Sequence, residues 1–263
     1  VSPQYRSNLD INVSNIGNAW KINGSGYYNY GFNKVGLIVD KNINLDNPDD
    51  TYLKNIYSSS DIDVNTGIDI TGSKSGQIFI IQANYGGSPG RNAVIINNNR
   101  DILGASGVIG IYSDGAATVQ NGKIVLGDAS TGIYSSGGTV NIAAGSEITV
   151  GNNRAAGVYA VNGSVITNNS SNVNAGENSV SFYIQDNGSK ITNFSNLSAN
   201  KNSTVFYLKD SEADNQGNIL ANGEKAVIFY GLNSRISNSG VLDAQGNSGV
   251  TAIYSKDSAV LNT

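Results

Sequence analysis

The sequence contains no cysteine, no methionine and no histidine. Without cysteine the chain can form neither disulfides nor thiolate nucleophiles, and without histidine it lacks the commonest general base and the commonest metal ligand. Secreted bacterial repeat proteins often manage without disulfides because stacking of their repeats stabilises them. These absences therefore exclude much familiar catalysis but leave the cellular compartment open.

Charged residues and proline are also scarce. Only 14% of the residues are charged, the net charge is −4, and there are 3 prolines. Neither half of the chain is basic, so it lacks the positive field that a nucleic-acid partner needs. No run approaches the roughly 20 apolar residues of a membrane-spanning helix, and the start at Val1 has no features of a signal peptide. We therefore expect a mature or excised soluble fragment with no nucleic-acid partner.

Glycine and asparagine are abundant, with 32 and 39 residues. Both tolerate the left-handed backbone geometry that tight turns need. The apolar residues are mainly isoleucine, valine, leucine and alanine, and they occur in short alternating runs that suit short strands. The composition predicts an all-β repeat protein.

Tyrosine marks a repeat in residues 101–263. Seven tyrosines are separated by 22 to 25 residues, and each follows an apolar residue. A period of this length is typical of a solenoid, in which each repeat stacks on its neighbours. The seven are Tyr112, Tyr134, Tyr159, Tyr183, Tyr207, Tyr230 and Tyr254.

An apolar-x-Asn element follows most of these tyrosines after about eight to ten residues. Turn asparagines tolerate left-handed geometry, and stacked side-chain amides can hydrogen-bond from one repeat to the next. One repeat has Val140-x-Ile142 instead, so we expect the asparagine column to be interrupted there. The predicted column contains Asn121, Asn168, Asn193, Asn215, Asn238 and Asn262.

Each repeat holds three short apolar-polar runs separated by glycine, asparagine and serine. Three strands per repeat predict a right-handed parallel β-helix with rungs of about 24 residues. We expect this β-helix to cover residues 36–263 and to be regular from residue 101.

The tyrosine side chains are expected to point outward. The residue before each tyrosine should face the core, together with Ile109, Val180 and Val227 three positions before, because alternate residues of a strand share a face. The alternative is that the tyrosines turn inward at a strand bend, where their hydroxyls find partners. Three glycines on the tyrosine face should leave space for the rings: Gly110, Gly132 and Gly157.

The period is weaker before residue 101. Tyr57 and the pair Phe79-Ile80 predict one further rung over 57–80, and the excess length before Tyr112 predicts an inserted loop near 84–91. Residues 1–35 are irregular and rich in aromatic residues. Because the open end of a solenoid exposes strand edges and core side chains, we expect this region to be an N-terminal cap.

The same aromatic residues carry a second interpretation. Exposed tyrosine and tryptophan are enriched at binding hot spots, so residues 1–35 are a candidate site for a sugar or a protein. The loop near 84–91 is a further candidate contact, because loops on a rigid scaffold often hold binding residues. The candidate ligand-binding residues are Trp20, Tyr27, Tyr28, Tyr30, Phe32 and Tyr85.

A glycan-cleaving enzyme on this fold would need two carboxylates at a suitable separation along a groove. One acidic group occurs at Asp210, Glu212 and Asp214. Its spacing is turn-like and no repeated acidic face emerges, so we assign it a structural or solvating role. No spaced calcium-ligand ladder and no phosphate-cradling loop occurs either. We expect no catalytic residue, no metal ion and no cofactor.

The repeat resembles the passenger repeats of large type V autotransporter adhesins, particularly those of fusobacteria. The resemblance covers about 57–80 and 101–263 and carries over no site residue. It implies a passenger domain at the extracellular surface, anchored in the outer membrane through a downstream β-barrel and used in coaggregation or host-cell adhesion. Because Thr263 falls in mid-rung, we expect the natural protein to continue beyond it. The resemblance is clearest in Val119-Gln120-Asn121-Gly122-Lys123-Ile124 followed by Gly132-Ile133-Tyr134.

Three hypotheses on function result. The first is a non-catalytic adhesin scaffold whose partners are proteins or glycans of host or bacterial cell surfaces. The second is a polysaccharide-binding or polysaccharide-degrading β-helix, similar to lyases and phage tailspikes. A groove in which two or more carboxylates converge with a lysine or arginine would favour the enzyme. The third is a purely structural stalk, favoured by buried aromatics and by cell binding that survives deletion of residues 1–35.

Overall fold

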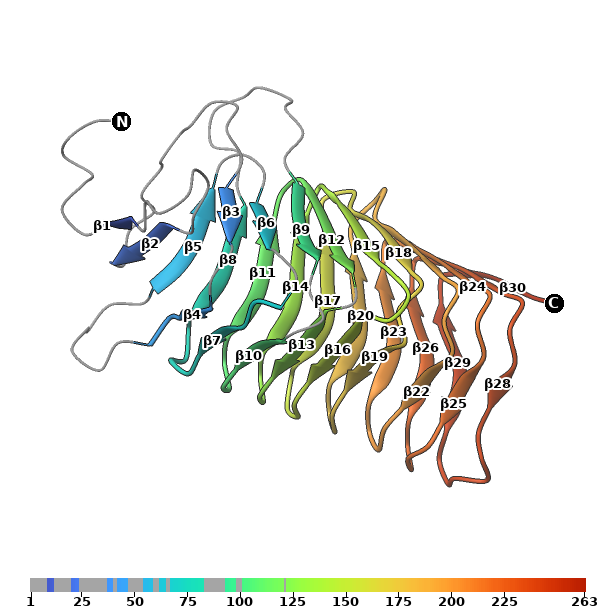
Figure 1. Cartoon of the computed structure of the whole chain (residues 1–263). Helices are drawn as coiled ribbons and strands as arrows, with labels where there is room; N and C mark the ends of the chain where they lie inside the picture. Colours follow the sequence, from blue (N-terminus) through green and yellow to red (C-terminus); the bar gives the residue numbers. More distant parts are fainter. Residues whose placement is uncertain are drawn as a thin grey trace.

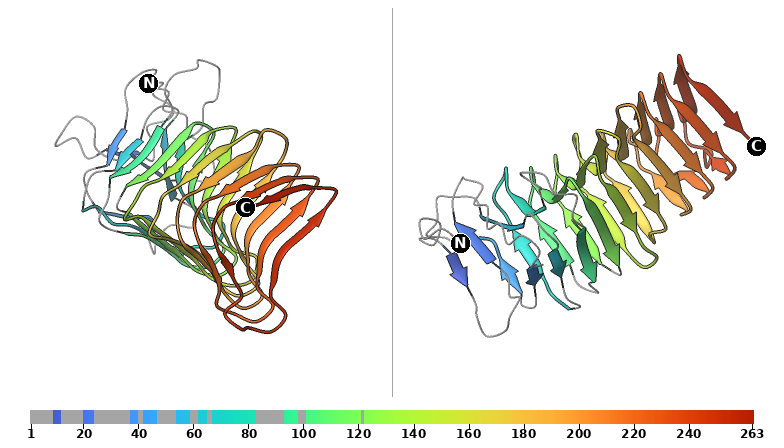
Figure 2. Two further views of the ribbon diagram at one scale, coloured as in Figure 1. Left: turned by 90° about the vertical axis from the view of Figure 1, so that its right-hand side faces the viewer. Right: turned by 90° about the horizontal axis from the view of Figure 1, so that it is seen from above.

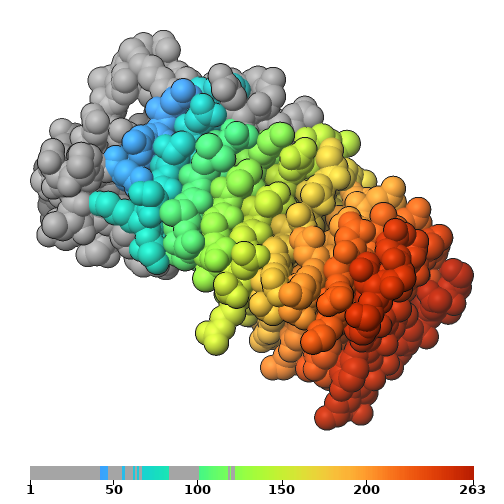
Figure 3. All heavy atoms as spheres, turned by 90° about the horizontal axis from the view of Figure 1, so that it is seen from below, coloured from blue at the N-terminus to red at the C-terminus, as the bar shows by residue number. Residues whose placement is uncertain are grey.

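Backbone pairing between successive rungs organises the chain. In the computed structural model, three sheets wrap around one core as a right-handed parallel β-helix, which confirms the predicted fold (Figures 1 and 2). The spheres of Figure 3 show the rungs following one another along a rod. The structure describes residues 9–11, 20–23, 37–39, 42–46, 54–58, 62–64, 67–82, 93–97, 101–120 and 122–263.

The first sheet, here named the tyrosine sheet, carries the seven tyrosines in register from strand to strand. Its first strand pairs antiparallel with the second, the second pairs antiparallel with the third, and all later pairs are parallel. In spatial order its strands are β1 (Leu9–Ile11), β2 (Trp20–Asn23), β5 (Lys54–Ser58), β8 (Ile78–Gln82), β11 (Ile109–Ser113), β14 (Thr131–Ser136), β17 (Ala156–Val161), β20 (Val180–Gln185), β23 (Thr204–Lys209), β26 (Val227–Leu232) and β29 (Thr251–Lys256).

The second sheet, named the asparagine sheet, follows after a short turn in each rung and is parallel throughout. Its strands are β3 (Leu37–Val39), β6 (Ile62–Val64), β9 (Ala93–Asn97), β12 (Ala116–Gln120), β15 (Thr139–Ile142), β18 (Val165–Asn168), β21 (Lys190–Asn193), β24 (Glu212–Asn215), β27 (Arg235–Asn238) and β30 (Ala259–Asn262).

The third sheet closes each rung. It consists of six paired strands and a three-stranded continuation. The six are β4 (Ile43–Asn44), β7 (Ile70–Gly72), β10 (Asp101–Gly104), β13 (Lys123–Leu126), β16 (Glu147–Val150) and β19 (Asn172–Ala175), and the continuation is β22 (Leu197–Ala199), β25 (Ile219–Ala221) and β28 (Leu242–Asp243).

Apolar side chains from all three sheets fill the interior. In one rung, Ile133, Ile142 and Ile148 come from the three different sheets, and all are fully buried. Later rungs place phenylalanine before the tyrosine. The rings of Phe182, Phe206 and Phe229 stack inside the core with centroids 5.5 and 4.8 Å apart. Burial of these columns supplies the main driving force for folding.

A ladder of buried asparagines runs up one corner of the asparagine sheet. Nδ2 of Asn193 donates to Oδ1 of Asn215 (2.6 Å) and to the carbonyl oxygen of Ser195 (2.8 Å), while its Oδ1 accepts from Nδ2 of Asn168 (2.7 Å). Both amide hydrogens are thus satisfied, as burial of an amide requires. The same amide-to-amide bond continues through Asn238 to Asn262 at 2.7 Å per step.

The ladder begins at Asn168, two rungs later than predicted. Ile142 takes the place of an asparagine as expected, but it precedes the ladder and does not interrupt it, because Val119 and not Asn121 is in register with Ile142. The prediction for Asn121 is wrong because β11 ends one residue after its tyrosine, whereas the later strands of the tyrosine sheet end two residues after theirs, and this brings the ladder position closer to Tyr112. Asn121 itself lies outside the described residues.

The tyrosine sheet bends just before its tyrosines, and this overturns part of the predicted alternation. Val205 and Phe206 are consecutive and both fully buried, so two adjacent side chains face inward there. Ile109, Val180 and Val227 were expected in the core but are only half-buried. The bend moves the inward position from three residues before the tyrosine to two.

The glycines before three of the tyrosines consequently face the core and do not make room for the rings. A Cβ atom on Gly132 would lie 2.7 Å from Cγ2 of Ile148, and one on Gly157 would lie 2.7 Å from Cγ1 of Val173. A Cβ atom on Gly110 would likewise lie 3.3 Å from Cγ2 of Ile124. These glycines allow close approach of the tyrosine sheet to the third sheet.

The predicted rung over 57–80 forms, with its register shifted by one residue. Ile80 pairs with Ile111, and Ile81 occupies the tyrosine column between Tyr57 and Tyr112. The pair Phe79-Ile80 was expected at that place, but both residues face the core. Residues 83–92 lie outside the described ranges, so the inserted loop near 84–91 stays a prediction, as do the boundaries of the cap.

The asparagine ladder should stabilise the rod measurably. Replacing Asn193→Ala leaves Nδ2 of Asn168 and Oδ1 of Asn215 buried without their partner, which should lower the free energy of unfolding by about 2 to 4 kcal/mol. Urea unfolding followed by circular dichroism measures this. Asn141→Ala, an outward-facing residue of β15, is the control and should change stability by about 0.5 kcal/mol or less. Equal effects of the two changes would contradict the role of the ladder.

Candidate functional site

Of the aromatic residues predicted to bind a ligand, the structure describes Trp20. Trp20 begins β2 and pairs with Ile11 in β1, so it belongs to the two antiparallel strands beyond the parallel helix. The other five candidates, Tyr27, Tyr28, Tyr30, Phe32 and Tyr85, lie outside the described residues. The aromatic binding site therefore stays a prediction.

The tyrosine ladder faces outward, as expected from the sequence. The residues preceding the tyrosines, from Ile111 to Phe229, are fully buried, and the tyrosines themselves are half-buried or, at Tyr254, exposed. Adjacent rings stack with centroids 4.5 to 5.3 Å apart and planes inclined by 10° to 16°. The spacing follows from the roughly 4.8 Å separation of paired strands.

This stacking limits what the ladder can bind. A sugar ring stacks on the face of an aromatic ring, but the faces of rings within the ladder are covered by the tyrosines above and below. The ring edges and the hydroxyl groups are what the ladder presents outward. The ladder is therefore a stabilising column with a polar edge, and it offers no row of sugar-stacking platforms.

Packing in the ladder also changes the acidity of its hydroxyls. Partial burial raises the pKa of Tyr183 to about 12, with smaller contributions from Tyr207, Tyr159 and Asp186. Partial burial likewise raises the pKa of Tyr159, helped by Tyr134 and Asp186. Loss of a proton at Tyr159 or Tyr183 would place a phenolate against neighbouring rings and a carboxylate, so these two hydroxyls remain protonated under ordinary conditions.

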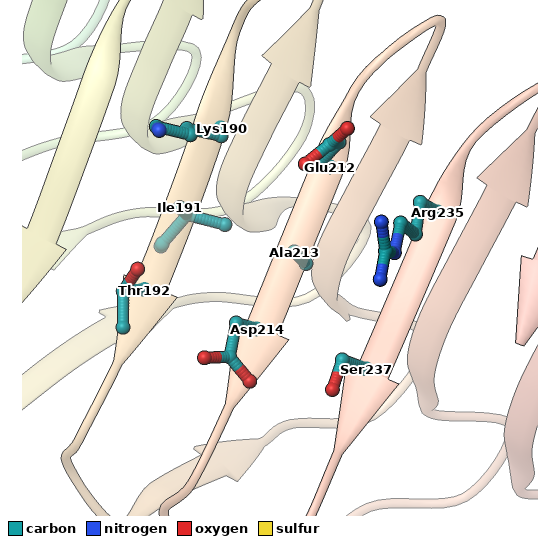
Figure 4. Close-up of a pocket in the computed structure, with 8 residues that line it drawn as sticks. All are labelled: Lys190, Ile191, Thr192, Glu212, Ala213, Asp214, Arg235 and Ser237. Atoms are coloured by element: carbon teal, nitrogen blue, oxygen red, sulfur yellow. The ribbon is translucent and has the colours of Figure 1, made fainter. Parts of the chain in front are cut away.

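A second outer feature lies on the asparagine sheet, where six side chains of β21, β24 and β27 form two rows (Figure 4). The first row is Lys190, Glu212 and Arg235, and the second is Thr192, Asp214 and Ser237. Each row is in register across the three strands. We name the space between the rows the polar trough.

The floor of the polar trough is the backbone of the three strands around Ile191 and Ala213. The side chains of these two residues are buried in the core, which holds the strands in place. The hollow has a volume of about 310 Å³. Its rows stand two residues apart along each strand, a separation of about 6.6 Å. The trough is thus a shallow, polar channel parallel to the axis of the rod.

The charged groups of the polar trough are available to a ligand. In the described ranges, ion pairs of 3.4 Å join Lys123 to Glu147 and Lys201 to Glu177, whereas no such pair joins the groups of the trough. Asp214 accepts one hydrogen bond, from Nε2 of Gln216 (3.1 Å). Figure 4 shows the guanidinium of Arg235 turned toward β24.

The arrangement combines two carboxylates with a lysine and an arginine, the combination that would favour an enzyme. Glu212 is exposed and Asp214 half-buried. A carboxyl group that acts as general acid is usually held in apolar, water-poor surroundings. The geometry therefore suits hydrogen bonding to a polar ligand better than proton transfer to it.

Sequence reasoning missed most of this feature. Glu212 and Asp214 were identified as an acidic group but assigned a solvating role, and Lys190 and Arg235 were not singled out. The available signal was the repeat itself. The residues on either side of the apolar position in each apolar-x-Asn element face outward, and aligning three consecutive elements places the four charges side by side.

Alkaline pH should destabilise the tyrosine ladder. Because the pKa of Tyr183 in the folded chain, about 12, exceeds the ordinary 10.0, the contribution to stability is fully present below pH 10 and is lost as pH rises through 12. Tyr183→Phe should therefore lose less stability than the unaltered chain between pH 10 and 12. Urea midpoints across this window measure the difference, and equal losses in both proteins would contradict the prediction.

No helix among the described residues is long and apolar enough to cross a membrane. Within the same ranges, no three acidic side chains gather in a way that could hold a metal ion. Comparison of the chain with protein-family models, with curated proteins and with solved structures found no match. Any function must therefore be argued from the sequence repeat and the geometry of the outer faces.

Proposed function

We propose that this chain is the rigid, non-catalytic scaffold of a cell-surface adhesin that presents binding residues to host or other bacterial cells. The observation that carries the proposal is the continuous locking of one rung to the next. Backbone pairing, stacked tyrosines and bonded asparagines each connect neighbouring rungs. A rod built in this way keeps its outward side chains at fixed spacing, as a display surface requires.

The resemblance of the repeat to autotransporter passengers supports the same proposal. Under it, the chain lies outside the cell, is anchored to the outer membrane, and contributes to adhesion and coaggregation. Its partners are proteins or glycans of the opposing cell surface. The polar trough and the aromatic residues before residue 35 are the candidate contacts.

A glycan-processing enzyme is the second candidate, because the polar trough brings Glu212 and Asp214 together with Lys190 and Arg235. The adhesin is preferred because these carboxylates lie on an open face. A purely structural stalk would leave the unpaired charges of the trough without a role.

Cell binding tests the adhesin proposal. The fluorescently labelled chain should bind a subset of bacterial or host cells saturably, and an excess of unlabelled chain should displace it. A Trp20→Ala/Tyr28→Ala variant that remains folded by circular dichroism separates the two contact regions: reduced binding would place the contact near the N-terminus, and full binding would place it on the parallel helix. Absence of saturable binding across a broad cell panel would refute the proposal.

Glycan depolymerisation tests the enzyme. Incubation with a panel of polysaccharides should release no new reducing or unsaturated ends. Release that disappears in a Glu212→Gln/Asp214→Asn variant would assign catalysis to the trough and replace the adhesin with the enzyme.

A further inference from the structure

We infer that the polar trough binds a linear, uncharged glycan lying along the axis of the rod. The inference deepens the proposed adhesin function, on which it rests, by naming the class of ligand and the residues that contact it. It stands on the register of three strands, the charge balance of the trough and one exposed aromatic residue that follows its second row along the chain.

The shape of the trough fits an extended chain. Its two rows run across β21, β24 and β27, so a ligand parallel to the axis meets one pair of side chains in every rung, about every 4.8 Å. That interval is close to the length of one hexopyranose unit in an extended polysaccharide. A glycan can therefore place one sugar opposite each rung and repeat the same contacts along the trough.

The chemistry of the rows fits sugar hydroxyls. Carboxylates of Glu212 and Asp214 accept hydrogen bonds, Lys190 and Arg235 donate them, and a hydroxyl group can do both. The two positive and two negative charges cancel. An anionic glycan would meet both carboxylates in a chain of net charge −4, so a neutral glycan is favoured.

The charges of the trough are confined to three rungs, although Thr167 adds one polar position before Thr192 in the second row. In the first row, Lys190 is preceded by Val165 and Arg235 is followed by Ala259. In the second row, Ser237 is followed by Leu261. These neighbours cannot form charged contacts with a ligand. The length of the trough therefore predicts a binding site for about three sugar units.

An exposed aromatic side chain follows the second row along the chain, just beyond the residues that line the trough. Phe194 follows Thr192 by two residues, is 47% exposed, and has its backbone amide fixed to the carbonyl oxygen of Asn168 (2.9 Å). Unlike the rings of the tyrosine ladder, it has no stacking partner among the described residues. Its face is free to pack against a sugar ring.

The strands beneath the trough are held rigidly. Ile191, Ala213 and Ile236 alternate with the outward residues and are almost completely buried. The asparagine ladder fixes the end of each strand. Because the backbone beneath the trough is already fixed, binding costs little backbone conformational entropy, which favours affinity for a flexible glycan.

Titration of immobilised chain with neutral linear oligosaccharides of two to six units tests the inference. Affinity should rise with length up to about three units and then level off. A Glu212→Gln/Arg235→Gln variant should bind about tenfold more weakly, since two charge-assisted hydrogen bonds are weakened. Phe194→Ala should reduce affinity by a similar factor.

The matched control is Lys123→Gln/Glu147→Gln, which alters an exposed ion pair on the third sheet and should bind like the unaltered chain. Binding of no neutral oligosaccharide, equal binding by the trough variants, or preference for anionic glycans or peptides would overturn the inference. If the trough variants still bind cells, only the inference about the glycan trough is refuted. If the unaltered chain binds no cells, the adhesin proposal itself is refuted.

Discussion

In-register parallel pairing of strands from one rung to the next is the constraint on which the other features depend. Because each strand lies directly above its counterpart, identical side chains meet at about 4.8 Å, and rings or amides can stack without adjustment. A slip of one residue would exchange the inward and outward faces and break every column at once. The tyrosine, phenylalanine and asparagine columns thus depend on the register and, by favouring one alignment, also stabilise it.

The same constraint builds the outer surface. Residues that are 22 or 23 positions apart in the chain, such as Lys190, Glu212 and Arg235, become immediate neighbours across a sheet. Their positions are set by buried residues between them and not by contacts of their own. A solenoid can therefore vary its outer rows with little effect on the core.

The fold was predictable because the tyrosine and asparagine columns repeat at a nearly constant period. Errors arose where a local event changed the count. The early end of β11 moved the ladder position from Asn121 to Val119, and a bend turned two consecutive residues inward at Phe79-Ile80 and at Val205-Phe206. Turn lengths and bends depend on packing between sheets, which no single repeat reveals. The polar trough was missed for a related reason, because its charges belong to three different repeats.

The asparagine ladder has a direction, since every Nδ2 donates to the Oδ1 of the following rung. Each rung in this part of the chain presents the acceptor Oδ1 to the preceding rung and the donor Nδ2 to the following one. Any such rung can therefore bond to any other of the same kind. Duplication or deletion of a whole rung between Asn168 and Asn262 would leave the chain of amides unbroken. In the earlier rungs of the same column, Val119 and Ile142 are buried apolar residues that carry no amide. The rod therefore has two segments. In the asparagine-bonded segment, whole rungs can be gained or lost during evolution without breaking the ladder, whereas the earlier segment has apolar residues at the ladder position.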